Sequence, residues 1–241
     1  MFAARPFRVL ITRAEPGATR SCAALDARGF EAINAATAIL KAHEITLDLK
    51  DVSLIAVTSP FGATCLADAT PERRLPVIAV GDVTASRLRQ AGFEKVNSAS
   101  GDARDLLAMI CERAPEGEVL HVRGVDQTGD LSAELNAKGV RARSEILYAA
   151  EPVPALSGEV WAALSDGAPV LIHSAKGAER FAALADAAQQ LNVLQASAVI
   201  GISAAAVEPL RRLGVQDITL ATQPDETALF AALEKRLSAR A

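Results

Sequence analysis

The chain has 241 residues, which is enough for one large domain or two small ones. Apolar residues make up 50% and aromatic residues only 4%, a composition that favours helices packed on parallel strands over an aromatic-rich β-sandwich. The net charge of -4 argues against the basic face that nucleic-acid binding requires, although a few local arginines could still hold a small acidic ligand.

Short apolar strands alternate with amphipathic helices along the whole chain. This alternation predicts an α/β protein whose parallel sheets are covered by helices on both faces. The expected strands lie near 8–12, 31–34, 53–58, 77–80, 94–98, 118–122, 141–144, 169–173, 197–202 and 216–220.

The second half of the chain repeats the first half. The segment that begins RVLITR at Arg8 resembles the segment that begins EVLHVR at Glu118, and the match continues from LIAVTSPFGA (54–63) to VLIHSAKGA (170–178). A repeat of this length is too long for a solenoid. Each copy supplies five expected strands, which is the size of a flavodoxin-like unit.

Two segments break the alternation, at 35–45 and 144–153. Both look extended and both carry an Ile-Leu pair. We expect them to cross between two lobes and to pair as a short, two-stranded ladder. The residues alone leave open whether each repeat folds by itself or exchanges its first two strands with the other repeat.

Small polar residues follow several expected strands, where ligands bind in open parallel sheets. Unpaired backbone N–H groups at such helix starts suit a carboxylate or a phosphate. For any single one of these residues, ordinary helix capping is the better explanation. Several such starts facing one cleft would instead favour a polyanionic ligand. The candidates are Thr58 and Ser59, Gly81 and Thr84, and Ser174 and Lys176.

Two arginines and one tyrosine complete the candidates that the residues themselves suggest. Arg13 and Arg123 follow equivalent strands and are candidates for bidentate carboxylate contacts, although a surface arginine is usually only solvated. Tyr148 is the single tyrosine and lies in the second crossing segment. Its phenol could give a proton or hydrogen bond to a leaving oxygen, or it could be a half-buried linker aromatic.

Other functional motifs are missing from the sequence. It has no dinucleotide fingerprint and no P-loop, and its three histidines lack metal-ligand spacing, so we expect no cofactor and no metal. Its three cysteines form no paired motif and are expected to be reduced. We read neither a signal peptide nor a membrane span, so we expect a cytoplasmic protein.

Taken together, these residues resemble the uroporphyrinogen-III synthase family over about 8–238. The motifs that carry the resemblance are VLITR (9–13), TSPFGA (58–63), VGDVTASRL (80–88), HVRG (121–124), ILY (146–148), HSAKG (173–177) and PDETAL (224–229). Each motif is weak alone, but their order and spacing are specific.

The resemblance implies a fold of two flavodoxin-like lobes joined by a two-stranded ladder. One lobe would hold 1–38 and 150–241, and the other 39–149. It also implies an activity without cofactor: closing the linear tetrapyrrole hydroxymethylbilane into uroporphyrinogen III, with loss of water and inversion of ring D. Such an enzyme would serve haem, chlorophyll or cobalamin synthesis and could receive its substrate from hydroxymethylbilane synthase. We expect a monomer, because each lobe can bury its own sheet.

By the same resemblance, Tyr148 takes the place of a tyrosine that assists departure of the substrate hydroxyl. Substrate-binding positions would be Arg13, Thr58, Ser59, Gly81, Thr84, Arg123, Gly124, Ser174, Lys176 and Ser203.

The chain departs from the family at one turn. Members often carry Gly-Pro-Thr-Thr there, where this chain has Ser203 followed by Ala204, Ala205 and Ala206. Two hydroxyls are therefore lost, and this loss favours a rival hypothesis of a non-catalytic tetrapyrrole or anion sensor. Retention of Tyr148 favours the enzyme. A second rival is a two-lobe solute-binding protein, which would usually be exported.

Overall fold

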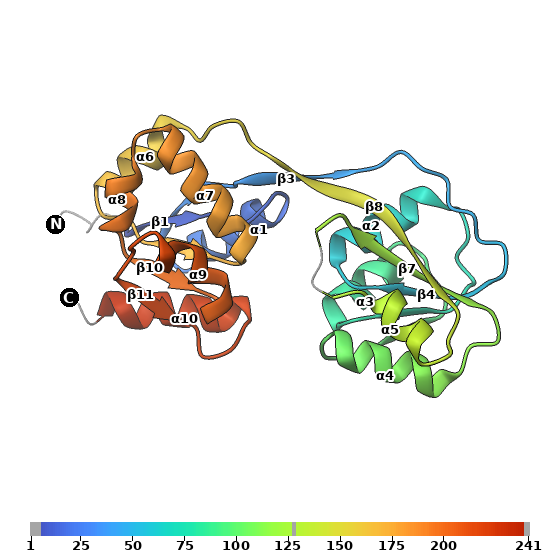
Figure 1. Cartoon of the computed structure of the whole chain (residues 1–241). Helices are drawn as coiled ribbons and strands as arrows, with labels where there is room; N and C mark the ends of the chain where they lie inside the picture. The colour runs from blue at the N-terminus through green and yellow to red at the C-terminus, as the bar shows by residue number, and fades with distance from the viewer. Residues whose placement is uncertain (1–5, 127–128, 239–241) are drawn as a thin grey trace. The chain divides into compact units, whose positions relative to one another are not determined.

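The computed structural model describes residues 6–126 and 129–238. These residues form two compact units (Figure 1): the chain up to Ile39 together with Glu151 onward makes unit 1, and Leu40–Ala150 makes unit 2. The outer ends of the predicted lobes, 1 and 241, lie outside the described residues. No helix within the described ranges is long and apolar enough to cross a membrane.

Unit 1 is built on a parallel sheet with the strand order β11-β10-β9-β1-β2 among the described residues. Its strands are β1 (Arg8–Ile11), β2 (Glu31–Asn34), β9 (Val170–Ile172), β10 (Val199–Gly201) and β11 (Ile218–Leu220). Its helices are α1 (Gly17–Asp26), α6 (Gly158–Ser165), α7 (Ala175–Ala187), α8 (Leu191–Gln195), α9 (Ala204–Arg212) and α10 (Glu226–Ser238).

Unit 2 is built on a second sheet with the order β3-β8-β7-β4-β5-β6. In this sheet, β8 pairs with β7, β7 with β4, β4 with β5 and β5 with β6, and all four pairs are parallel. Its strands are β3 (Ala38–Ala42), β4 (Val52–Val57), β5 (Val77–Ala79), β6 (Val96–Ser98), β7 (Glu118–Gly124) and β8 (Ala142–Pro152). Its helices are α2 (Pro60–Ala69), α3 (Asp82–Gln90), α4 (Ala103–Arg113) and α5 (Leu131–Ala137).

The two repeats exchange strands. β1 and β2 come from the first repeat but pair with β9, β10 and β11 of the second, whereas β7 and β8 of the second repeat join β4, β5 and β6 of the first. If the five strands of each repeat are numbered from 1 to 5 in chain order, the strands from the repeats follow the flavodoxin order 2-1-3-4-5 in both sheets. The structure thus decides the question that the residues left open, and confirms an α/β protein with two parallel-sheet lobes.

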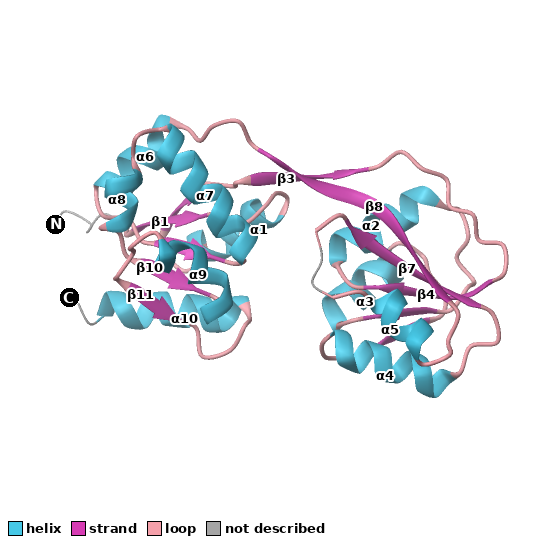
Figure 2. Cartoon of the chain, viewed as in Figure 1, coloured by secondary structure: helices cyan, strands magenta, loops and turns pink. Residues whose placement is uncertain are grey.

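Each sheet buries both faces, as its continuous apolar strands require (Figure 2). In unit 1, Leu10 faces a core made with α6, α7 and α9, and its neighbours Val9 and Ile11 face a core made with α1 and α10. In unit 2, Ile55 packs toward α2 and α3 and Leu54 toward α4 and α5. Because side chains alternate along a strand, neighbouring residues at a strand end serve opposite faces.

The second crossing segment is not a separate element. The sequence predicted a strand at 141–144 followed by an extended crossing, but β8 runs without interruption from Ala142 to Pro152. No proline or glycine lies between Arg141 and Glu151 to end the strand. Its first part pairs with β7, and β3 is its neighbour on the other side.

Candidate functional site

Each sheet has one point where the strand order reverses. It lies between β1 and β9 in unit 1 and between β7 and β4 in unit 2. In open α/β sheets, ligands bind beside the carboxyl ends of the strands at such a switch point. Arg13 and Ser174 follow the strands of the first switch point. Thr58, Ser59 and Arg123 lie at the strand ends of the second.

Tyr148 is placed at the second switch point by an irregularity in the pairing of β7 with β8. Arg123 pairs with Ile146, but the next residue, Gly124, pairs with Tyr148, so that Leu147 is an extra residue on β8. Such bulges re-aim side chains next to functional sites. A Cβ atom on Gly124 would lie 2.5 Å from Tyr148 Cε2, which shows that the ring packs directly on the glycine.

The Tyr148 hydroxyl lies within hydrogen-bond distance of Ser59. Its oxygen lies 2.8 Å from Ser59 Oγ, which also accepts a 2.9 Å hydrogen bond from the backbone N–H of Gly62. Phe61 meets the ring edge to face, with centroids 5.1 Å apart. Burial raises the pKa of Tyr148, so the phenol keeps its proton at neutral pH. The arrangement holds a proton donor in a fixed orientation.

A row of polar side chains occupies the other face of the same switch point. Thr58 Oγ1 lies 3.4 Å from Nε2 of His121, and Nδ1 of that ring lies 3.3 Å from Ser144 Oγ. Ser144 Oγ is 2.8 Å from Ser132 Oγ, which donates a 2.7 Å hydrogen bond to Asp130. Burial, helped by the charge of Arg123, lowers the pKa of His121 to about 4, so the ring is neutral.

Arg123 is held by backbone carbonyls. Its Nη1 donates to the carbonyl oxygens of Gly124 and Val125, at 3.0 and 3.4 Å. Its Nε atom is buried and has no hydrogen-bond partner among the described residues. A buried donor without a partner costs free energy, and ligands often supply the missing acceptor.

The first switch point gathers three polar side chains around one carboxylate. Arg13 Nη1 lies 3.1 Å from Oε1 of Glu226, at the start of α10, and Ser21 of α1 donates a hydrogen bond to the same oxygen. His173 Nε2 is 3.6 Å from it. Arg13, predicted to bind a ligand carboxylate, therefore already holds a carboxylate of this chain. It lies against Gly17, where a Cβ atom would be 2.6 Å from its Nε.

His173 is the second buried group with unmet hydrogen-bonding capacity. Its side chain is 8% exposed, and neither ring nitrogen has a hydrogen-bond partner among the described residues. The 3.6 Å approach to Glu226 is therefore an ion-pair distance rather than a hydrogen bond. Each switch point therefore contains a buried side chain with nitrogen atoms that lack a hydrogen-bond partner among the described residues: His173 at the first and Arg123 at the second.

The Glu226 cluster consists of Glu226, Arg13, Ser21 and His173. It makes the free energy of unfolding depend on pH in the acid range. His173, Ser21 and Arg13 hold the pKa of this carboxyl at about 2, against partial burial, which would raise it. A lowered folded-state pKa stabilises the fold above the unfolded value of 4.5 and ceases to do so as pH falls through about 2. We expect the free energy of unfolding to fall less steeply between pH 4.5 and 2 in Glu226→Gln than in the unchanged chain, in urea titrations. Equal slopes would contradict the assignment.

The other predicted residues serve mainly as helix caps. Ser59, Ser174 and Ser203 accept hydrogen bonds from the backbone N–H of Gly62, Gly177 and Ala206, at 2.9, 3.0 and 3.2 Å. Gly81 is the N-cap residue of α3 without a side-chain bond. Thr84 is 2% exposed, and Lys176 is exposed, 3.9 Å from Glu179.

Sequence reasoning missed the residues that connect these groups. The candidates did not include Ser132, Ser144, Asp130, Ser21, Glu226, His121 or His173. One signal was available: Asp130 and Glu226 each stand at the start of an expected helix, where an acidic residue has a defined role.

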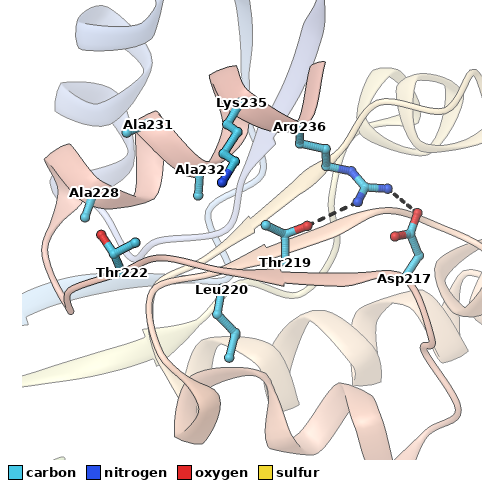
Figure 3. Close-up of a pocket in the computed structure, with 9 residues that line it drawn as sticks. All are labelled: Asp217, Thr219, Leu220, Thr222, Ala228, Ala231, Ala232, Lys235 and Arg236. Carbon is cyan, nitrogen blue, oxygen red and sulfur yellow. Dashed lines mark hydrogen bonds and ion pairs between the residues drawn. The ribbon is translucent and has the colours of Figure 1, made fainter. Parts of the chain in front are cut away.

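A cavity away from both switch points lies between β11 and α10. It has a volume of about 550 Å³ and contains Thr219, Leu220, Thr222, Ala232 and Lys235 in its lining. Figure 3 shows Arg236 reaching from α10 to Thr219 and Asp217, with the first bond at 3.1 Å. In the ranges that the structure describes, no group of three or more His, Cys, Asp or Glu side chains is arranged to hold a metal ion.

Comparison with known proteins identifies the family. The model of the family described as "Uroporphyrinogen-III synthase HemD" matches residues 20–231. No curated protein matches the chain in sequence.

Solved structures agree in fold. The uroporphyrinogen-III synthetase of Helicobacter pylori is 16% identical and has a TM-score of 0.67, with 96% of this chain and 99% of that chain covered. A mutant uroporphyrinogen III synthase of Thermus thermophilus is 17% identical, with the same coverage and a TM-score of 0.55. Because the family model spans most of the sequence, the chain belongs to the uroporphyrinogen-III synthase HemD family.

Proposed function

We propose that this protein is an active uroporphyrinogen-III synthase, a hydro-lyase that closes hydroxymethylbilane with inversion of ring D. Family membership supports the substrate class. The observation that carries the catalytic part is the Tyr148 hydroxyl, held 2.8 Å from Ser59 Oγ at the switch point of unit 2. A phenol in this position is a fixed acid, which is the group that the first step requires.

The first step is loss of the substrate hydroxyl as water. Tyr148 gives its proton to the departing oxygen, and Ser59 directs its own proton to the phenol oxygen as negative charge develops there. Electrons of the adjacent pyrrole nitrogen replace those of the broken C–O bond and give a cationic azafulvene. No nucleophile of the protein takes part, so the protein contributes acid catalysis and positioning.

The remaining steps rearrange the last ring. Ring D attacks the azafulvene through its substituted carbon and forms a spiro intermediate. This intermediate fragments and recloses through the unsubstituted carbon, which then loses its proton to restore the aromatic ring. Binding must favour the spiro attack, because direct closure gives the type I isomer. Arg13 and Arg123 are proposed carboxylate contacts, the first after release from Glu226.

An isomer assay tests the proposal. Porphobilinogen and its deaminase generate hydroxymethylbilane in the cuvette, this protein is added, and the oxidised products are separated by chromatography. We expect type III uroporphyrin to dominate. Type I alone, formed at the rate without protein, would refute the enzymatic proposal. The proposal includes a monomeric protein in the cytoplasm that receives its substrate from hydroxymethylbilane synthase in a transient encounter.

A non-catalytic sensor of tetrapyrroles is the second candidate. The observation that favours it is the start of α9, where Ser203 uses its oxygen to cap the helix and the next three residues are alanines without hydroxyls. A sensor would bind a tetrapyrrole without forming the type III isomer. Equilibrium binding of uroporphyrin by fluorescence, measured beside the isomer assay, separates the two candidates.

A further inference from the structure

A chain of hydrogen bonds links Thr58 through His121, Ser144 and Ser132 to Asp130, and the donor and acceptor of each bond can be assigned. Asp130 is exposed, and the Ser132 hydroxyl and the N–H of Ala133 lower the pKa of its carboxyl, so it is ionised and can only accept. Ser132 has one hydroxyl proton and gives it to Asp130. In its contact with Ser144, Ser132 must therefore be the acceptor. Ser144 must donate its only hydroxyl proton to Ser132.

The direction continues through the imidazole. Ser144 has no second proton, so it accepts from Nδ1 of His121, which carries the single proton of the neutral ring. Nε2 is then an acceptor, and the Thr58 hydroxyl donates to it. The opposite tautomer would need Ser132 to donate to both Ser144 and Asp130. The carboxylate at one end thus determines the hydroxyl orientation at the other.

We propose that Asp130, Ser132, Ser144 and His121 form a hydroxyl relay that fixes Thr58 as a hydrogen-bond acceptor and thereby makes it select a pyrrole N–H of the ligand over a carboxylate. Thr58 is partly exposed and lines a cavity of about 260 Å³. Its oxygen keeps lone pairs there but has no proton to offer. Ionised acetate and propionate groups can only accept hydrogen bonds, whereas each pyrrole nitrogen donates one.

The four relay residues are positioning residues, because they act on the ligand through Thr58. The inference rests on the proposed function for the identity of the N–H donor. The direction of the relay itself rests only on the contacts of unit 2. It changes the interpretation of Thr58 from an anion contact at a helix start to a group that discriminates against anions.

The first experiment measures the tautomer and needs no substrate. The full chain is labelled with ¹⁵N-histidine, and its three histidines are distinguished with His121→Gln. At pH 7 we expect His121 to carry its proton on Nδ1. In Ser132→Ala, Ser144 can turn and donate to Nδ1, so the proton should move to Nε2. A proton on Nε2 in the unchanged chain, or no movement in Ser132→Ala, would overturn the relay.

A second variant guards against a folding defect, because Ser132 is buried. Asp130→Gly removes the acceptor at the exposed end of the relay, and glycine at an N-cap position costs only a few tenths of a kcal/mol. It should move the His121 proton as Ser132→Ala does. Asp102→Gly is the matched control, since Asp102 is another N-cap aspartate of unit 2, at α4, with no relay contact. The control should leave the tautomer unchanged.

A double-mutant cycle tests the effect on the ligand. With hydroxymethylbilane as substrate, Ser132→Ala should raise KM about three- to tenfold, the size of one ordinary hydrogen bond, and leave kcat within about twofold. In a Thr58→Val background the same change should have no further effect on KM. An undiminished effect in that background would overturn the role of Thr58. Absence of any type III product from the unchanged chain would refute the proposed function, while the tautomer result still decides the relay.

Discussion

Replacing Tyr148 with phenylalanine is expected to lower kcat for the type III product by about 10²- to 10⁴-fold, the range of general acid catalysis, and to change KM by less than about threefold. Phenylalanine keeps the edge-to-face contact with Phe61, which has 5.1 Å between centroids, so only the hydroxyl is lost. The first step then has no fixed acid for the departing oxygen. Initial rates with hydroxymethylbilane, followed by chromatography of the isomers, provide the measurement.

The ratio of isomers gives this experiment its control. If Tyr148 acts only on hydroxyl departure, the small amount of enzymatic product should still be type III, because the shape that favours spiro attack is intact. An unchanged kcat would remove Tyr148 from the mechanism. A shift to type I with an unchanged total rate would instead assign the tyrosine to orientation of ring D.

The Gly124→Ala variant should have the second large effect. The new Cβ would lie 2.5 Å from Cε2 and 2.7 Å from Cζ of Tyr148, so the ring must move away from the strand. The hydroxyl then leaves Ser59, and kcat should fall at least about tenfold. Overpacking of this kind also costs about 1–3 kcal/mol of unfolding free energy. Denaturant unfolding and isomer-resolved rates measure the two effects separately.

Gly158→Ala is the matched control for that substitution. A Cβ atom at Gly158, the first residue of α6, would meet nothing within 4 Å, and the residue is not at a switch point. Activity and stability should stay close to those of the unchanged chain. If Gly124→Ala behaved like this control, the close packing of Tyr148 on β7 would have no catalytic importance.

The repeats and the alternation of elements were sufficient to predict the fold class. Apolar strands such as that around Leu54 bury both faces, and this pattern is visible in residue order alone. The family resemblance is confirmed by the family model and the structural neighbours. The strand exchange was not predictable from the residues, because either repeat contains the five strands of a complete sheet.

The relay and the Glu226 cluster depend on tertiary position and were missed for that reason. Ser144 meets His121 because the two residues are register partners on parallel strands, a fact set by pairing and not by their spacing. Glu226 meets Arg13 only when the last helix covers the sheet that β1 joins. The residues of each contact are far apart in the sequence, so neither contact could be predicted from it. The bulge that turns Tyr148 toward Ser59 likewise leaves no mark in the residue pattern.

The strand exchange has a consequence for synthesis of the chain on the ribosome. Unit 2 is continuous in sequence, so all of it is translated before β9. β1 is made first, yet one of its two neighbours in the sheet is β9. Leu10 packs in a core made with α6, α7 and α9, so its native burial is complete only after the second repeat has been translated. A chain that ended near Ala150 would contain all of unit 2 but would leave β1 without its neighbour β9, and an unpaired strand edge of this kind promotes aggregation.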